Sequence, residues 1–434
     1  MSKPTDPRPA KDRRRWPFWK KLLVSITTVL VSFGLAETIV TAFYLRGDIE
    51  PQSIWIHATD NQTAAVEFDP VLGYRLAAAP TRMMIIGSNG SIESSGTFRG
   101  NNLGAPDDDD FSPNRGPDNR KRFVVLGDSF TSGLYMERSW PDIAETLSQQ
   151  DNSPVELLNF SIDGGGLANW QQVLTRIIVA DDYDIDGIIF AVYGTDLSRP
   201  FTFWDQVIPG YNQPMRLGRW PDFDVRQPGA IGRDQLEPLD TWQVVSSQVF
   251  DQYLSGQRRP PISRPFRLYL TGKCRALLST LFQHDGESGQ LLESLQHLPD
   301  AELFFRDRRH VISRIEDALQ KQRLPALVVH IPYREVLLAR AGVPSENMAF
   351  YLESVGQSWE TQAFAKLIHA DFVDGSEAFK DCSVAEIRDN WLPIDGHWNQ
   401  AGAERFAKFL APILKSWPGQ AKPTGNTSSA SRPR

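Results

Sequence analysis

Phe123-Val-Val-Leu-Gly-Asp-Ser-Phe130 is the stretch that decides the fold of this chain. Its apolar first half, Phe123–Leu126, is typical of a buried strand, and the strand pattern ends abruptly at Gly127-Asp128-Ser129. A serine on a glycine-assisted turn at the end of a buried strand holds its hydroxyl at the edge of the sheet. An oxygen nucleophile can be presented to a substrate in this way.

From Arg122 onward, short apolar runs alternate with amphipathic ones. Strands are predicted at Phe123–Leu126, Val155–Phe160, Gly187–Val192, Ala326–Ile331 and Ala370–Val373, and helices at Trp140–Gln149, Asn169–Val179, Leu303–Gln322, Met348–Leu367 and Asn399–Leu414. This alternation predicts an α/β fold of three layers, a parallel sheet with helices on both faces. Ligands of such sheets bind beyond the carboxyl ends of the strands, where Ser129 and Gly164 both fall.

The alternation is interrupted at about residues 200–300, which we expect to form an insertion rich in aromatic residues. Its rings are Phe201, Phe203, Trp204, Tyr211, Trp220, Phe223 and Trp242. They could stack on sugar rings or an aglycone, or they could form a small core of the insertion itself. The predicted organisation is a linker and N-terminal extension at 46–120 (the linker over 47–66), the α/β domain at 121–416, and a disordered tail at 417–434.

The chain has 434 residues, a net charge of −7 and a pI of about 5.6, which is not the charge of a nucleic-acid-binding protein. A basic segment at 1–21 precedes an apolar run at 22–45, and a membrane-spanning helix needs roughly 20 such residues. We therefore predict a transmembrane signal anchor in a bacterial inner membrane, with the domain on the periplasmic or extracellular side and a possible membrane-protein partner. A signal peptide cleaved after Gly34-Leu-Ala36 is the alternative.

The two cysteines, Cys274 and Cys382, are compatible with a disulfide in an exported domain and equally with two free thiols. The seven histidines and two cysteines show no metal-ligand spacing. No metal and no cofactor are therefore predicted.

Four segments carry residues suited to acyl-ester chemistry. They are Gly127-Asp-Ser129, the glycine cluster Gly164-Gly-Gly166, the strand end Gly194-Thr195-Asp196, and Asp395-Gly-His397-Trp398 at the start of the last predicted helix. Serine with a histidine base is the common arrangement for an activated hydroxyl. Glycines let the backbone approach a reacting carbonyl and direct an N–H group at it.

In their order and placement these segments resemble the four blocks of the SGNH (GDSL-type) hydrolase superfamily, over about residues 122–200 and 325–416. The resemblance implies a flavodoxin-like fold, with Ser129 as nucleophile and His397 as general base. It assigns the oxyanion to Ser129, Gly164 and the third-block residue, here Thr195. Asp395 would fix the histidine tautomer. The segment 68–76 further resembles leader segments of membrane-anchored bacterial members.

Two features depart from the usual pattern of the superfamily. Thr195 stands where an asparagine is usual, and the loss of one oxyanion donor costs about 10²–10³ in rate. Asp395-Gly-His397-Trp398 is shorter than the common Asp-x-x-His and resembles the alginate O-acetyltransferase branch. Gly396 is expected to give the backbone the freedom that brings Asp395 to His397.

Each residue also has a structural interpretation. Ser129 could cap a helix. His330, at the end of the strand Ala326–Ile331, is a rival base that we interpret as a core residue. Asp128 and Asp196 are interpreted as loop organisers, and Trp398 is expected to pack beside the site.

Three functions compete. The first is an exported serine acyl-ester hydrolase, which would act through an acyl-serine on an ester (an O-acetyl group) of an envelope or extracellular glycan. The second is a polysaccharide O-acetyltransferase with the same intermediate. The third is a non-catalytic binding protein on an SGNH scaffold.

Overall fold

The computed structural model describes residues 17–45, 53–59, 66–69, 71–87, 89–118, 120–150, 154–194, 196–204, 214–217, 236–238, 242–258, 305–343 and 348–418. The chain divides into two units, residues 1–51 with 261–278 and residues 52–260 with 279–434. Within the described ranges, every strand belongs to the second unit.

The described residues of the first unit form one helix, α1 (Phe18–Leu45), which contains the whole apolar run at 22–45. Searched over the described residues, the structure holds no helix both long and apolar enough to cross a membrane. The described residues therefore do not support the predicted transmembrane anchor.

A five-stranded parallel sheet forms the centre of the second unit. Its strands are β6 (Lys121–Leu126), β7 (Val155–Asn159), β8 (Gly187–Tyr193), β13 (Ala326–Ile331) and β14 (Asp371–Asp374), in the order β14-β13-β8-β6-β7. All five predicted strands are confirmed. Counted along the chain the order is 2-1-3-4-5, the flavodoxin-like doubly wound arrangement, in which the strand order reverses between β6 and β8.

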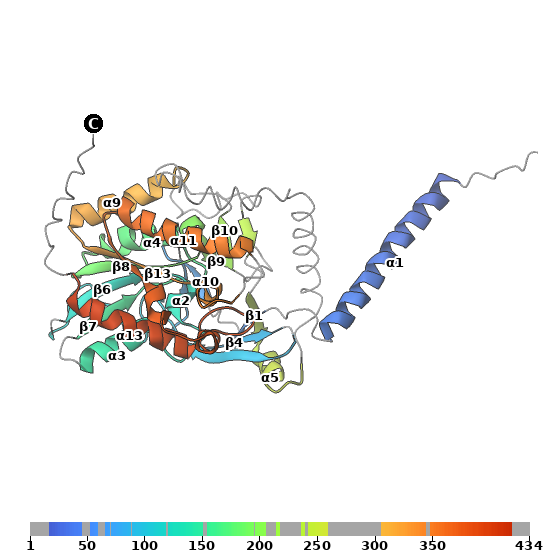
Figure 1. The fold of residues 1–434 in the computed structure, drawn as a ribbon, viewed down its shortest axis with the longest axis horizontal. Helices are drawn as coiled ribbons and strands as arrows, with labels where there is room; N and C mark the ends of the chain where they lie inside the picture. Colours follow the sequence, from blue (N-terminus) through green and yellow to red (C-terminus); the bar gives the residue numbers. More distant parts are fainter. Residues whose placement is uncertain are drawn as a thin grey trace, which may run out of the picture. The chain divides into compact units, whose positions relative to one another are not determined.

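Helices cover both faces of this sheet, as the alternating pattern predicts. Figure 1 shows α3 (Trp140–Gln150) and α13 (Gln400–Ser416) on one face and α4 (Leu167–Val173), α9 (Arg309–Gln322) and α11 (Met348–Leu367) on the other. A π-helical segment, Leu174–Ile178, continues α4. The start of α9 is later than predicted, because residues 305–308 form a turn. Shorter helical segments of the described chain lie around the strand ends: α2 (Ser129–Ser132), α10 (Arg334–Arg340), α12 (Val384–Asp389) and the 3₁₀ turns at Asp196–Ser198 and Gly375–Phe379.

The central strands are fully buried, which explains their continuous apolar sequence. Phe123, Val124, Val125 and Leu126 of β6 each have 0% exposure. A strand between two helical layers has no solvent-facing side, so apolar residues occupy successive positions.

The N-terminal extension forms structure of its own. β1 (Ser53–Thr59), β4 (Thr81–Gly87), β5 (Ile92–Phe98) and β12 (Trp242–Ser246) make a four-stranded sheet in the order β12-β1-β4-β5, and β2 (Val66–Asp69) pairs with β3 (Gly73–Leu76) in a hairpin. The prediction of a linker over 47–66 is therefore wrong for 53–59. The alternating run 54–58 packs its apolar side chains against β4 and against α5 (Ser247–Leu254).

One strand of the predicted insertion, β12, completes this four-stranded sheet by pairing in parallel with β1. Three others, β9 (Thr202–Trp204), β10 (Pro214–Leu217) and β11 (Leu236–Pro238), form a separate small antiparallel sheet. Phe201 lies in the main core with 0% exposure. The other six rings of the insertion lie outside the described side chains, as do Cys274 and the tail from 419.

Candidate active site

Ser129 begins α2 directly after β6, at the point where the strand order reverses. The side chain of Asp128 caps this short helix by accepting a hydrogen bond from the Phe130 N–H at 3.0 Å. Ser129 is buried except for 8% of its surface. In doubly wound sheets the crevice at such a switch point is where ligands bind.

The structure brings together Ser129, His397 and Asp395. The distance from Ser129 Oγ to His397 Nε2 is 2.7 Å, and His397 Nδ1 is paired with Asp395 Oδ1. Gly396, between the acid and the histidine, has φ +84°, a conformation that residues with a side chain rarely adopt. The glycine therefore allows the tight reversal that the spacing Asp-x-His requires.

The charges of this group favour a histidine base supported by an ionised acid. Burial alone would raise the pKa of Asp395, but His397 and the hydrogen bonds from His397, Trp55 and Ser53 outweigh it and lower the pKa to about 2. Burial alone would lower the pKa of His397, but the Asp395 carboxylate outweighs it and raises the pKa. A carboxylate that stays ionised holds the imidazole in one tautomer and stabilises the imidazolium that forms on proton transfer.

Aromatic rings fix the orientation of the His397 imidazole. Phe130 stacks on it with 4.5 Å between ring centroids, and Trp55 and Tyr135 stand at 5.1 Å and 5.2 Å. Trp398 packs against the edge of Phe130 at 5.1 Å and is fully buried, as expected for a residue beside the site. The ring is therefore held toward Ser129 by packing as well as by its hydrogen bonds.

The N-terminal sheet supplies contacts that sequence reasoning missed. Trp55 Nε1, on β1, donates to Asp395 Oδ2 at 2.7 Å, across 340 positions of sequence. Glu93, on β5, accepts hydrogen bonds from the backbone N–H groups of Ile394 and Asp395 at 2.6 Å and 2.8 Å. No local pattern in the sequence could have indicated them, since each depends on the packing of distant segments.

The oxyanion residues predicted from sequence are placed in part. Gly164 follows β7 with φ +68°, and its loop is tied to the nucleophile turn by the Ile162 N–H, which donates to Gly127 O at 3.1 Å. Within the described ranges no hydrogen bond takes up the N–H of Ser129, the first residue of α2. Thr195 lies outside the described residues, between Gly194 at the end of β8 and Asp196.

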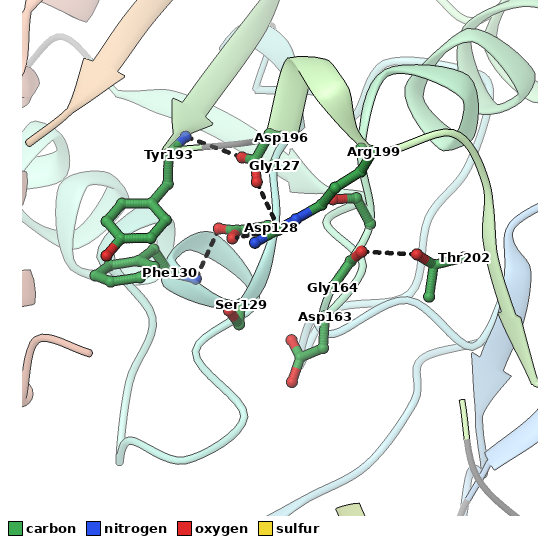
Figure 2. A network of polar contacts seen from close by, with 12 residues as sticks. Gly127, Asp128, Ser129, Phe130, Asp163, Gly164, Tyr193, Asp196, Arg199 and Thr202 are labelled. Carbon is green, nitrogen blue, oxygen red and sulfur yellow. Dashed lines mark hydrogen bonds and ion pairs between the residues drawn. The ribbon is translucent and has the colours of Figure 1, made fainter. Parts of the chain in front are cut away.

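A buried ionic network lies under the nucleophile turn (Figure 2). Arg199 Nη1 contacts Asp128 Oδ2 at 3.1 Å and Asp196 Oδ1 at 2.6 Å, while Asp196 Oδ2 accepts the Tyr193 N–H at 2.9 Å. Both carboxylates have at most 1% exposure. Burial and the charge of Asp128 raise the pKa of Asp196 well above its usual range. Burial alone would lower the pKa of Arg199, but the two carboxylates outweigh it and raise it.

Asp128 and Asp196, which were expected to organise their loops, do so through Arg199, because the network joins the turn after β6 to the turn after β8. Sequence reasoning missed Arg199. Two acids at neighbouring strand ends, with an arginine three positions after one of them, are the pattern that could have indicated it.

His330 is a core residue, as interpreted from the sequence. It lies in β13 with 4% exposure, its Nδ1 is 3.3 Å from Thr361 Oγ1, and burial lowers its pKa to about 4. In the part of the chain that the structure describes, no group of three or more His, Cys, Asp or Glu side chains is arranged to hold a metal ion.

No protein-family model and no curated protein matches this sequence. Solved structures to which this chain is similar include a lipase/acylhydrolase from Enterococcus faecalis, with a TM-score of 0.33 and 9% identity over 68% of this chain and 96% of that chain. A carbohydrate acetylesterase family member from Sinorhizobium meliloti has a TM-score of 0.27 and 14% identity over 68% and 98% of the two chains. An acetyl xylan esterase variant from Geobacillus stearothermophilus has a TM-score of 0.31 and 12% identity over 68% and 94%.

Proposed function

We propose that this protein is a serine ester hydrolase of the SGNH type. The observation that carries the proposal is the hydrogen-bonded chain from Ser129 Oγ through the His397 imidazole to Asp395, at the switch point of a doubly wound sheet. A nucleophile in contact with a base, and a base oriented by a third group, is the geometry that defines such a triad.

In the proposed reaction, His397 Nε2 takes the proton of Ser129 as Oγ attacks the carbonyl carbon of an ester. The backbone N–H groups of Ser129 and Gly164 stabilise the oxyanion that forms. His397 then gives its proton to the leaving alcohol as the carbon–oxygen bond breaks, which leaves an acyl-serine. Water, deprotonated by His397, attacks the carbonyl carbon of this ester. His397 then returns the proton to Ser129 Oγ as the bond between the acyl carbon and Oγ breaks, which releases the acid and free Ser129.

The proposal extends to the acyl group and the alcohol of the ester. An acetyl ester of an envelope or extracellular glycan stays a prediction from the family resemblance, and so does a location outside the cytoplasm. Transfer of the acyl group to a sugar hydroxyl would use the same triad. Its sequence support is Asp395-Gly-His397-Trp398, but Trp398 is fully buried behind Phe130, where it packs the site and is not exposed to an acceptor.

The test is hydrolysis of p-nitrophenyl acetate by the full chain, with Ser129→Ala beside it. We expect turnover in the wild type, its loss in the variant, and labelling of Ser129 by a fluorophosphonate. Turnover that survives in Ser129→Ala would refute the assigned nucleophile. An inactive and unlabelled wild type would favour a binding protein on this scaffold. Added oligosaccharide acceptors separate transfer from hydrolysis, because a transferase makes an acetylated oligosaccharide in competition with water.

A further inference from the structure

Three successive carbonyl groups of the Gly164 loop each accept a hydrogen bond from a side chain. The Tyr74 hydroxyl donates to Asp163 O at 2.9 Å, Thr202 Oγ1 donates to Gly164 O at 2.7 Å, and Arg199 Nη1 donates to Gly165 O at 3.4 Å. Figure 2 shows the contact of Thr202 with Gly164. None of the three donors lies on the loop itself, so the loop is held from outside.

The contact of Tyr74 falls on the peptide group that matters for the oxyanion. Asp163 C=O and Gly164 N–H belong to the same peptide unit. This unit is planar and trans, so its N–H group points opposite to its C=O group. A donor that fixes the carbonyl therefore also fixes the direction of the Gly164 N–H. A hydrogen bond to the carbonyl oxygen polarises the unit and makes its N–H a stronger donor.

The hairpin β2–β3 holds Tyr74 firmly in this position. Tyr74 has 4% exposure. Its neighbour Gly73 has φ +93°, and a Cβ there would lie 2.0 Å from Thr202 O, so the close approach of β3 to Thr202 of β9 requires a glycine. Asn169 Nδ2, itself fully buried, donates to Leu72 O at 3.0 Å and to Thr202 O at 2.8 Å. The same contacts therefore hold in place the strands that carry both donors, Tyr74 on β3 and Thr202 on β9.

We propose that Tyr74 is a positioning residue for catalysis, which aims and polarises the Gly164 N–H toward the oxyanion of the reacting ester. The inference rests on the proposed esterase function. It assigns a role in that reaction to the N-terminal extension, because the hydroxyl that orients the Gly164 N–H comes from the β2–β3 hairpin.

The test compares the full-length wild type with Tyr74→Phe, which removes only the hydroxyl. We expect kcat for p-nitrophenyl acetate to fall about 10-fold, less than the ~10²–10³-fold for outright loss of an oxyanion donor, with KM unchanged. A loss made only in the transition state lowers kcat alone, whereas a loosened fold would also change KM and the midpoint of thermal unfolding.

Tyr183→Phe is the matched control. Tyr183 is also buried, with 8% exposure, but precedes β8 at the amino ends of the strands, so this variant should keep the wild-type kcat. Thr202→Val is a second variant, which frees the following peptide unit and should lower kcat less than Tyr74→Phe does. If Tyr74→Phe folds poorly, Thr202→Val still tests the inference. A Thr202→Val enzyme with a raised KM and the kcat of the wild type would overturn it.

A Tyr74→Phe enzyme with the kcat of the wild type would overturn the role of Tyr74 and leave the proposed function intact, provided that Ser129→Ala is inactive. An inactive wild type that no fluorophosphonate labels would overturn both. A fall in kcat shared by Tyr183→Phe would show a general packing effect and would also reject the inference.

Discussion

Replacing Arg199 by methionine should destabilise the fold strongly, because the residue is the cation between two buried carboxylates. Asp128 and Asp196 have 1% and 0% exposure, and both lie within 3.1 Å of the same Arg199 nitrogen. The ~0–1 kcal/mol typical of surface ion pairs therefore does not apply. Removing one partner of a buried ionic group costs about 3–5 kcal/mol, since the remaining charge has no water to solvate it. We expect a loss of about 3 kcal/mol near neutral pH.

The pH dependence of this loss has a definite sign. The pKa of Asp196 is raised in the folded protein, so its neutral form is favoured there and the carboxyl destabilises the fold increasingly as pH rises above its unfolded value of about 3.9. Arg199 offsets this cost in the wild type. The loss of stability in Arg199→Met should therefore grow as pH rises and Asp196 becomes charged, and should be smallest at acid pH, where Asp196 is neutral in both proteins.

The assay is urea unfolding followed by tryptophan fluorescence at several pH values. The matched control is the double variant Asp196→Asn, Arg199→Met, which removes one of the two facing charges along with the cation. It should recover about 1–3 kcal/mol of the loss, because one buried carboxylate is less costly than two. A loss below about 1 kcal/mol in Arg199→Met, or a double variant no more stable than the single one, would refute the reasoning.

Three further outcomes follow from the site. Only the neutral imidazole of His397 can accept the serine proton, and the pKa of His397 is raised. The pH profile of kcat/KM should therefore fall on the acid side with a midpoint above 6.5, the ordinary pKa of histidine. A midpoint below 6.5 would contradict this. Asp395→Asn should lower kcat by about 10⁴ with a normal fold by circular dichroism, and a loss below about tenfold would reject the assigned role. Gly73→Ala should lower the thermal midpoint, since its Cβ would lie 2.0 Å from Thr202 O at a φ of +93°; a wild-type midpoint would argue against the close approach.

The central sheet could be predicted from sequence because its determinants are local. A strand buried between two helical layers shows as a continuous apolar run, and each of the five runs lies where a strand is observed. The position of Ser129 and Gly164 at strand ends then follows from the topology. His397 and Asp395 could be placed with them only through the family resemblance, since no periodicity relates a C-terminal histidine to a serine 268 positions earlier.

The residues that support the site could not be predicted in the same way, and the reason is physical. Residues 53–59 resemble a linker in sequence because a short alternating strand needs a partner to be stable, and its partners lie at 81–87 and 242–246. The role of the insertion at about 200–300 could not be predicted for a related reason: its described segments β12 and α5 pack on β1, so these segments share a core with the N-terminal sheet.

The N-terminal extension is consequently part of the site and not an appendage to it. Trp55 and Glu93 position the acid of the triad, and Tyr74 holds the peptide that carries the Gly164 N–H. A triad alone requires only the blocks at the strand ends, but those blocks are loops, and a loop has few contacts with which to fix its own backbone. The β1–β4–β5 sheet and the β2–β3 hairpin supply these contacts from elsewhere in the chain. The geometry of the proposed active site therefore depends on segments whose sequences carry no catalytic motif.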